Sequence, residues 1–197
     1  MLRGGARGRY IIERGFDMKK IVLLVSTLML ISCGGGGGGG GSNDTPTGPS
    51  PTSYTASFDA NTPSASSNYV KMEQTSISGD TVTIAVKAVS IAEPVGGLAV
   101  DVTYDTTKLE YVSATNGDAI NGNTSSFAAS DSSGTVIISV SDVTDSSPVT
   151  SGTLLTITFK GTAKGDGSVG LSNGSLFNAG GDIISGVSWY GGTVVVE

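Results

Sequence analysis

Short runs of alternating hydrophobic and polar residues fill the chain from residue 54 onward, and they predict β-strands. In residues 81–87, valine and isoleucine alternate with threonine, alanine and lysine. Because successive side chains of a strand point to opposite faces, this alternation turns one face toward a core and the other toward solvent. In chain order, strands are predicted at 54–58, 69–73, 81–87, 98–105, 109–113, 127–129, 135–140, 154–160, 169–171 and 193–196.

Turn sequences separate these strands, and no helix is predicted. Ser78-Gly79-Asp80, Asn116-Gly117-Asp118 and Gly165-Asp166-Gly167 are typical of tight turns between strands. No window of ten or more residues has the apolar periodicity of a helix. Nine or ten strands therefore predict an all-β fold, a single two-sheet β-sandwich domain at residues 54–197.

The N-terminal part of the chain carries a secretion signal. Two lysines after Met18 precede an almost continuous apolar run, and together they predict a lipoprotein signal peptide at residues 18–32. The run has about eleven residues, whereas a membrane-spanning helix needs about 20. Leu30-Ile31-Ser32-Cys33 resembles a bacterial lipobox, so we expect lipidation at Cys33, the only cysteine of the chain.

Two further segments lie on either side of this signal. Residues 1–17 contain four arginines, and because a signal peptide starts near its own methionine, we expect an incorrectly assigned start; a targeting extension is the alternative. Residues 33–53 hold eight consecutive glycines and then serine, threonine and proline, which predicts a disordered linker. Such a linker reaches roughly 25 Å and holds a domain clear of a membrane. In Gram-negative lipoproteins in general, glycine rather than aspartate directly after the lipidated cysteine favours the outer membrane. We therefore expect a lipid-anchored protein of the outer membrane or the cell surface.

Composition excludes several classes of function. The chain has no histidine and one cysteine, which rules out zinc fingers, histidine-based catalysis and a disulfide framework. From Cys33 onward it has five lysines, no arginine and fifteen acidic residues, a net charge of −10. A surface this acidic does not bind the phosphates of nucleic acid. Proteins or neutral glycans are the partners that remain.

Four segments, in the order in which the family has them, resemble the cohesin domain. Residues 70–86 look like its first two strands, and residues 97–112 resemble its third strand, its Tyr-Asp-x-x-x-Leu-Glu turn and the next strand. Residues 152–160 and 191–196 match its eighth strand and its closing strand. The resemblance covers about residues 69 to 197 and implies a nine-stranded, jelly-roll-like sandwich.

The resemblance also implies a function, because cohesins bind a dockerin module on one sheet face. In cellulosomes that pairing docks glycoside hydrolases onto a scaffold. We therefore expect a non-catalytic envelope lipoprotein whose module docks a dockerin-like or other protein, with a link to polysaccharide degradation. Two alternatives remain: a carbohydrate-binding module that holds polysaccharide at the cell, and a structural envelope protein that pairs its sheet edges with a neighbour.

The predicted docking residues are polar and lie on two predicted strands. The position at which several cellulosomal cohesins place a contact aspartate is Ala99 in this chain, and Asp101 follows two residues later. A flat polar face that favours protein docking is expected around the following residues: Asp101, Thr103, Asp105, Thr156 and Thr158. Asp101 and Asp105 lie about 13 Å apart along a strand. Glycosidase carboxylates lie about 5–9.5 Å apart, so we expect no catalysis from this pair.

Aromatic residues near the C-terminus are candidates for stacking on sugar. Trp189 and Tyr190 offer aromatic faces, but adjacent residues of a strand point to opposite sides, so at most one can join a platform. Packing in the core or at a sheet edge is the alternative for Trp189. We expect Tyr111, Phe127 and Phe177 to be core residues.

No cofactor or metal site of the chain's own is expected. Four loop aspartates are candidates for calcium, whose ligands are oxygens, but no twelve-residue EF-hand pattern occurs. The chain is therefore not itself a dockerin; solvation is the alternative for the loop aspartates, and a dockerin-like partner is a second route by which calcium can enter. The four candidates are Asp142, Asp145, Asp166 and Asp182.

Overall fold

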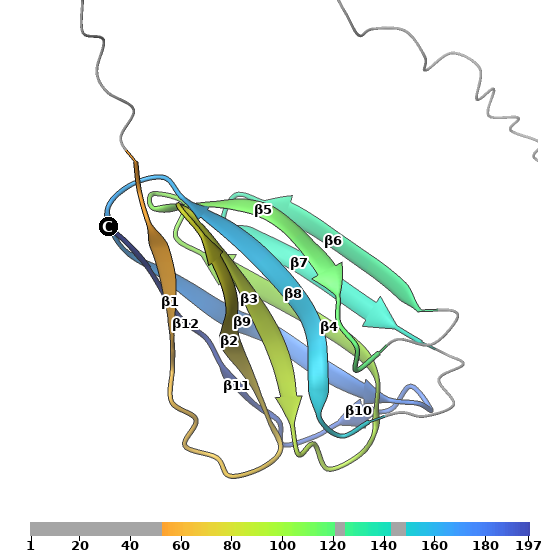
Figure 1. The fold of residues 1–197 in the computed structure, drawn as a ribbon. Helices are drawn as coiled ribbons and strands as arrows, with labels where there is room; N and C mark the ends of the chain where they lie inside the picture. Colours follow the sequence, from red (N-terminus) through yellow and green to blue (C-terminus); the bar gives the residue numbers. More distant parts are fainter. Residues whose placement is uncertain (1–52, 121–124, 143–148) are drawn as a thin grey trace, which may run out of the picture. The chain divides into compact units, whose positions relative to one another are not determined.

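A computed structural model describes residues 53–120, 125–142 and 149–197, and it contains twelve strands and no helix in these residues (Figure 1). The strands are β1 (Ala56–Ala60), β2 (Tyr69–Ser78), β3 (Thr81–Val89), β4 (Val95–Tyr104), β5 (Leu109–Asn116), β6 (Ser126–Ser132), β7 (Thr135–Ser141), β8 (Gly152–Gly161), β9 (Gly165–Asn178), β10 (Ile183–Ile184), β11 (Ser188–Tyr190) and β12 (Gly192–Val196). Each of the ten predicted segments overlaps a strand, which confirms the all-β prediction. The short β10 and β11 were not predicted.

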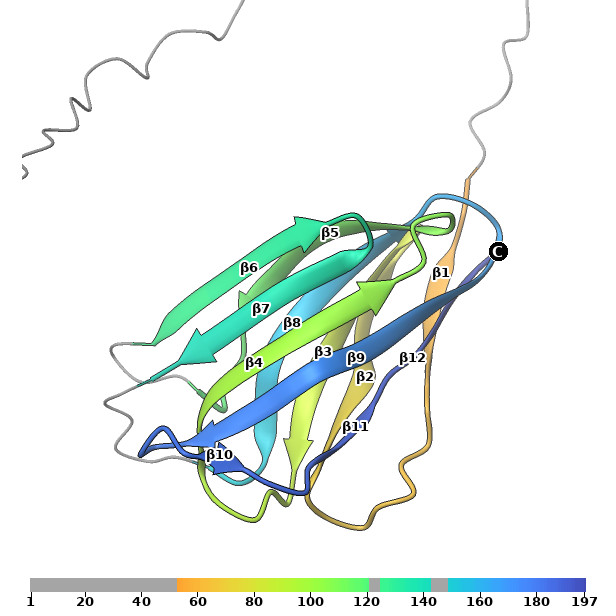
Figure 2. The ribbon, with the colours of Figure 1, turned by 180° about the vertical axis from the view of Figure 1, so that it is seen from behind.

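The strands form two sheets that face each other. The seven-stranded sheet has the order β1-β12-β9-β4-β7-β6, with β10 paired to β9, and the five-stranded sheet has the order β11-β2-β3-β8-β5. The five-stranded sheet is nearer the viewer in Figure 1, and the seven-stranded sheet is nearer in Figure 2. All pairings are antiparallel except that of β11 with β2. The fold is thus the expected two-sheet β-sandwich.

The core lies between the sheets and follows the alternation of the sequence. Val82, Ile84 and Val86 of β3 are fully buried, and the threonines on either side of Val82 lie on the outer side. β8 repeats the pattern with Ile157 and Phe159. Burial of these side chains stabilises the domain by about 1.5–3 kcal/mol each.

The two outer edges of the seven-stranded sheet differ. The amide N–H groups of Ala56 and Phe58 on β1 donate to Gly79 O at 2.9 Å and to Gln74 Oε1 at 2.7 Å. These bonds close the β1 edge against other strands. At the opposite edge, β6 pairs with β7 in one unbroken register over all seven of its residues.

Several sequence-based expectations lie outside the described residues. These are the extension at 1–17, the signal peptide at 18–32, the lipidated Cys33, the linker at 33–53 apart from its last residue, and Asp145. In the part of the chain that the structure describes, no helix is long and apolar enough to cross a membrane.

Candidate functional site

The structure divides the predicted docking residues between two surfaces. Asp101 and Thr103 lie on β4 of the seven-stranded sheet, whereas Thr156 and Thr158 lie on β8 of the five-stranded sheet. The expectation of one flat polar face around all four is therefore wrong. The alternation correctly predicted that each of these residues points outward. The two outer faces of a sandwich point in opposite directions, however, and alternation does not tell which sheet a strand joins.

The outer face of β9, β4, β7 and β6 is built from small side chains. Strand register places its outward residues in four rows, because residues directly opposite in an antiparallel pair share a face. We call this surface the serine-rich face, and its rows are Phe177, Gly97, Ser141 and Ser126; Ser175, Ala99, Ser139 and Ala128; Ser172, Asp101, Ile137 and Ser130; and Gly170, Thr103, Thr135 and Ser132. Asp101 is the one charged residue of this set.

Large apolar side chains on this face are exposed to solvent. Ile137, in the third row, is 55% exposed, and Ile183 on β10, directly opposite Phe177, is 67% exposed. Contrary to the prediction of a core position, Phe177 points outward and is only partly buried, whereas Tyr111 and Phe127 do pack against the core. Ile77 on β2 and Val112 on β5 of the other sheet are also exposed, at 48% and 51%, so what distinguishes this face is the set of small side chains around its apolar groups.

Asp101 is held in place by a neighbouring strand. The Nδ2 of Asn173 donates a hydrogen bond of 2.7 Å to Oδ2 of Asp101. Asn173 has a φ of +50° and lies where β9 has an extra residue opposite β4, so the bulge aims its amide at the carboxylate. A carboxylate that is fixed in this way still has lone pairs with which it can accept a hydrogen bond from an incoming donor.

Asp105 has a structural role in the turn after β4. Its Oδ1 accepts hydrogen bonds from the backbone N–H of Thr107 at 2.9 Å and from the Thr107 hydroxyl at 2.7 Å. The side-chain bond first, and then the backbone bond, lower the pKa of Asp105. These contacts identify the Tyr-Asp-x-x-x-Leu-Glu sequence as an Asx turn, and they place Asp105 outside the serine-rich face.

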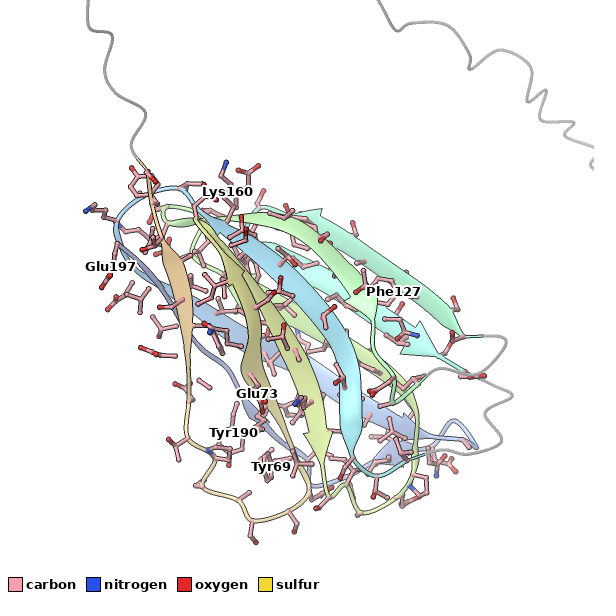
Figure 3. The ribbon with its side chains drawn as sticks, in the orientation of Figure 1. Tyr69, Glu73, Phe127, Lys160, Tyr190 and Glu197 are labelled. Carbon is pink, nitrogen blue, oxygen red and sulfur yellow. The ribbon has the colours of Figure 1, made fainter. Side chains whose placement is uncertain are left out.

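The outer face of the five-stranded sheet has its polar groups paired with each other. Thr158 shares a hydrogen bond of 3.1 Å with Thr83, and Thr156 shares one of 2.6 Å with Thr115. Lys71 and Lys87 both contact Glu73, at 2.9 Å and 3.1 Å. Glu73 and Lys160 are labelled on this side in Figure 3. Cross-strand pairs of this kind stabilise a sheet, so this face has an explanation without a ligand.

We expect Glu73 to titrate below its ordinary pKa of 4.5, because hydrogen bonds from Lys71 and then Lys87 favour the carboxylate. A lowered pKa in the folded state adds stability above the unfolded pKa, and this stability is lost as the pH falls through the folded pKa. An NMR pH titration measures it. The double variant K71Q/K87Q should move the pKa of Glu73 back up, whereas K160Q should not. Titration of Glu73 at or above 4.5 in the native protein would contradict the assignment.

The two aromatic candidates near the C-terminus serve the fold. Trp189 is half-buried against the core, and its ring lies over Gly174, where a Cβ atom would be 2.4 Å from Cε2. Tyr190 contacts Ser64 Oγ at 3.0 Å and accepts from the backbone N–H of Ala65 at 3.2 Å. Its ring meets that of Tyr69 edge-to-face with 5.8 Å between the centroids. Both side chains are labelled in Figure 3. These contacts account for both rings and argue against a sugar platform here.

Replacing Gly174 by alanine should destabilise the domain by about 1–3 kcal/mol, the usual cost of overpacking. The added methyl group overlaps the Trp189 ring, whose backbone strand β11 pairs with β2. Urea unfolding measures the change. The neighbouring S172A variant, at an exposed position, should stay within about 0.5 kcal/mol. Equal stability of G174A and the native protein would show that Trp189 is not packed there.

No metal centre is found among the described residues. They contain no group of three or more histidine, cysteine, aspartate or glutamate side chains that could hold an ion. Asp142 is 3% exposed. Asp182 is exposed on a loop, whereas Asp166, which was expected on a loop, is exposed on β9, where it pairs with Val195 of β12.

Comparison with known proteins identifies the family. The profile of the cohesin domain matches residues 69–196. The chain belongs to the cohesin domain family. This membership agrees with the resemblance found in the sequence, and cohesins are non-catalytic binding modules. A comparison with curated protein sequences found no match.

Solved cohesins share the fold of this chain. A type II cohesin domain from the cellulosome of Acetivibrio cellulolyticus is 20% identical with a TM-score of 0.55, over 66% of this chain and 94% of that one. Type II cohesin A11 of Bacteroides cellulosolvens is 13% identical with a TM-score of 0.53, over 64% and 96%. The sixth cohesin of A. cellulolyticus scaffoldin B, in complex with a mutant Cel5 dockerin, is 19% identical with a TM-score of 0.51, over 68% and 96%.

Two residues that matter for this cohesin's surface were missed in the sequence. Ile137 is the outward apolar residue of a strand whose other large apolar residues face inward. The run Thr-Val-Ile-Ile-Ser-Val contains that signal, because strict alternation requires position 137 to be polar. Phe177 had no such signal, since its orientation depends on the bulge in β9.

Proposed function

We propose that this protein is a cell-envelope receptor whose cohesin domain docks a dockerin-type module on the serine-rich face. The observation that carries the proposal is the composition of that face: one charge, Asp101, an exposed Ile137, and otherwise glycine, alanine, serine and threonine, apart from the partly buried Phe177. Small side chains let another protein approach closely, and covering the exposed apolar groups lowers the free energy of the complex.

The chemistry of the face indicates what the partner presents. An apolar side chain of the partner is needed to cover Ile137, and a hydrogen-bond donor is needed opposite Asp101. The hydrogen bond from Asn173 already occupies one acceptor site of the Asp101 carboxylate and fixes the orientation of this side chain. A partner donor would therefore meet a carboxylate that loses little conformational entropy on binding.

Family membership and one solved relative support a dockerin as the partner. The scaffoldin B cohesin, which shares the fold, was solved in complex with a dockerin. Calcium would enter the complex through the dockerin-type partner, since the described residues hold no cluster for it.

The location proposed for this receptor rests on the sequence. Lipidation of Cys33 would anchor the chain in the outer membrane or at the cell surface, and the glycine-rich linker would hold the domain away from the lipid. A dockerin on a secreted hydrolase would then be kept at the cell, which is the link to polysaccharide degradation.

Affinity capture tests this function. The full-length protein, purified as the producing cell processes it, is immobilised and exposed to secreted and envelope proteins of the same organism, with and without a calcium chelator. We expect calcium-dependent capture of a protein with duplicated EF-hand-like loops, and weaker capture by D101A. A T158A variant, altered on the opposite face, is the matched control. Absence of any such partner would refute the dockerin proposal.

Glycan binding is less well supported by the described residues. Every aromatic side chain among them is partly or fully buried, so no exposed aromatic row exists on either sheet there. Polysaccharide affinity of the native protein that survives alanine substitution of Ile137 and Asp101 would favour the glycan function instead.

One edge strand favours the structural alternative. β6 is seven residues long, contains no proline, and carries one charged side chain, Asp131, whose Oδ1 accepts a hydrogen bond from the Tyr104 hydroxyl at 3.0 Å. An edge of this kind can pair with another strand. If it does, the protein self-associates in solution, and A129P shifts it toward the monomer in analytical ultracentrifugation.

A further inference from the structure

A recess of about 360 Å³ lies at the β10 end of the serine-rich face. Its floor is formed by Gly97 and Ala99 of β4, one wall by Phe177 of β9, and the other by Ser139 and Ser141 of β7. Figure 2 shows these three strands side by side, with β10 beside the end of β9.

The recess exists because β4 carries almost no side chain there. A Cβ atom at Gly97 would lie 3.4 Å from Cβ and 3.5 Å from Cδ2 of Phe177, so this ring borders the space directly. On β10, the exposed Ile183 lies opposite Phe177 and extends the apolar border of the recess. Two apolar side chains therefore flank one side of an opening whose floor is glycine and alanine.

The charged groups near the recess lie at its rim, where Asn178 donates a hydrogen bond of 2.9 Å to Glu93 Oε2 and Gly180 lies beside the carboxylate of Asp182. The two serines offer hydroxyl groups, and Asp142 at one end is a buried residue, 3% exposed, whose backbone N–H donates to Gly96 O at 3.0 Å. Asp101 is two residues further along β4, about 7 Å from Ala99 at the usual rise of a strand. A cationic or strongly polar occupant would find no partner in the floor, whereas an apolar one would be desolvated favourably.

We propose that this recess receives a bulky apolar side chain of the docked protein and is the principal anchor point of the interface. The inference rests on the proposed docking function and specifies its partner: the dockerin-type module carries an exposed leucine, isoleucine, methionine or phenylalanine that enters between Phe177 and the β7 serines. The recess is continuous with the face that presents Ile137 and Asp101, so the anchor belongs to the same interface as these two residues.

A protein side chain fits the recess better than a free small molecule. Small-molecule sites use a few converging polar groups to fix the ligand's orientation. Here the floor is glycine and alanine, the polar side chains lie at the borders, and the amide of Asn178 already donates to Glu93. A side chain on a docked protein needs no such groups, because the contacts at Ile137 and Asp101 orient the protein that carries it. Deep apolar anchors surrounded by weaker contacts are typical of protein interfaces.

Display of a dockerin library tests the anchor. Dockerin modules loaded with calcium are selected on the full-length protein, and each selected clone is measured against A99L and S139L, which fill the recess from two neighbouring strands. A128L is the matched control, because Ala128 lies in the same row but outside the recess. Thermal unfolding of each variant confirms that it is folded.

The expected result has three parts. A99L and S139L each weaken binding by at least 30-fold, A128L weakens it less than threefold, and alanine replacement of one exposed apolar residue of the dockerin costs a similar factor. The two losses should not add, because both remove the same contact. Unchanged binding to A99L and S139L, together with lost binding to I137D, would overturn the anchor but keep the docking face. No selected clone at all would overturn both.

Discussion

Replacing Ile137 by aspartate should weaken binding of a dockerin-type partner by about 100-fold or more. Ile137 is 55% exposed near the middle of the serine-rich face, and docking would bury it. A carboxylate there would be desolvated without a partner, beside the existing charge of Asp101 in the same row. Interface positions of this kind are worth about 2–4 kcal/mol, and each 1.4 kcal/mol is tenfold in affinity. Isothermal titration calorimetry measures the change.

The matched control for this prediction is V112D. Val112 on β5 is 51% exposed, almost as much as Ile137, but it belongs to the five-stranded sheet. Its replacement introduces the same charge at a similar exposure and should leave affinity within threefold. Equal losses from both variants would point to a general effect of charge, and loss from V112D alone would move the docking site to the other sheet.

Replacing Phe159 by alanine should remove about 3–5 kcal/mol of stability, the usual cost of deleting a buried phenylalanine. Phe159 is fully buried near the C-terminal end of β8, with its ring centroid 5.1 Å from that of Tyr104 and 6.4 Å from that of Tyr111. These two tyrosines come from opposite sheets, so the cavity would weaken the contact between the layers. The free energy of unfolding of a domain is about 5–15 kcal/mol in total, so the variant should be only marginally stable.

Urea unfolding tests this prediction: the urea concentration at the midpoint should fall, while the dependence of the unfolding free energy on urea stays unchanged. The control is F177A, which removes the same ring from the partly exposed outer face and should cost about 1–2 kcal/mol. If F159A and F177A were equally destabilising, Phe159 would not be the central contact between the sheets.

Much of this fold could be predicted from local pattern. The alternation in residues 81–87 and 154–160 placed Val82, Ile84, Ile157 and Phe159 inward, and all four are fully buried. The period of two arises from backbone geometry, so it is visible wherever one face is buried. β10 and β11 escaped prediction because two or three residues are too few to show a period.

The candidate site was only partly predictable, because it depends on how strands are assembled. Asp101 was recognised as an outward residue of the third-strand region, and the structure places it in the serine-rich face. Thr156 was predicted to share a face with Asp101, although β8 belongs to the other sheet. Sheet membership is set by contacts between strands far apart in the sequence, for example β4 with β9, and these leave no mark in the local pattern.

Methyl NMR of the full-length protein with a saturating calcium-loaded dockerin module tests the central claim most directly, because it reports both outer faces at once. The account predicts that the methyl signals of Ile137 and Ala99 shift or broaden while those of Val112 and Thr158 stay in place. Shifts at Val112 and Thr158 with Ile137 and Ala99 unchanged would contradict docking on the serine-rich face.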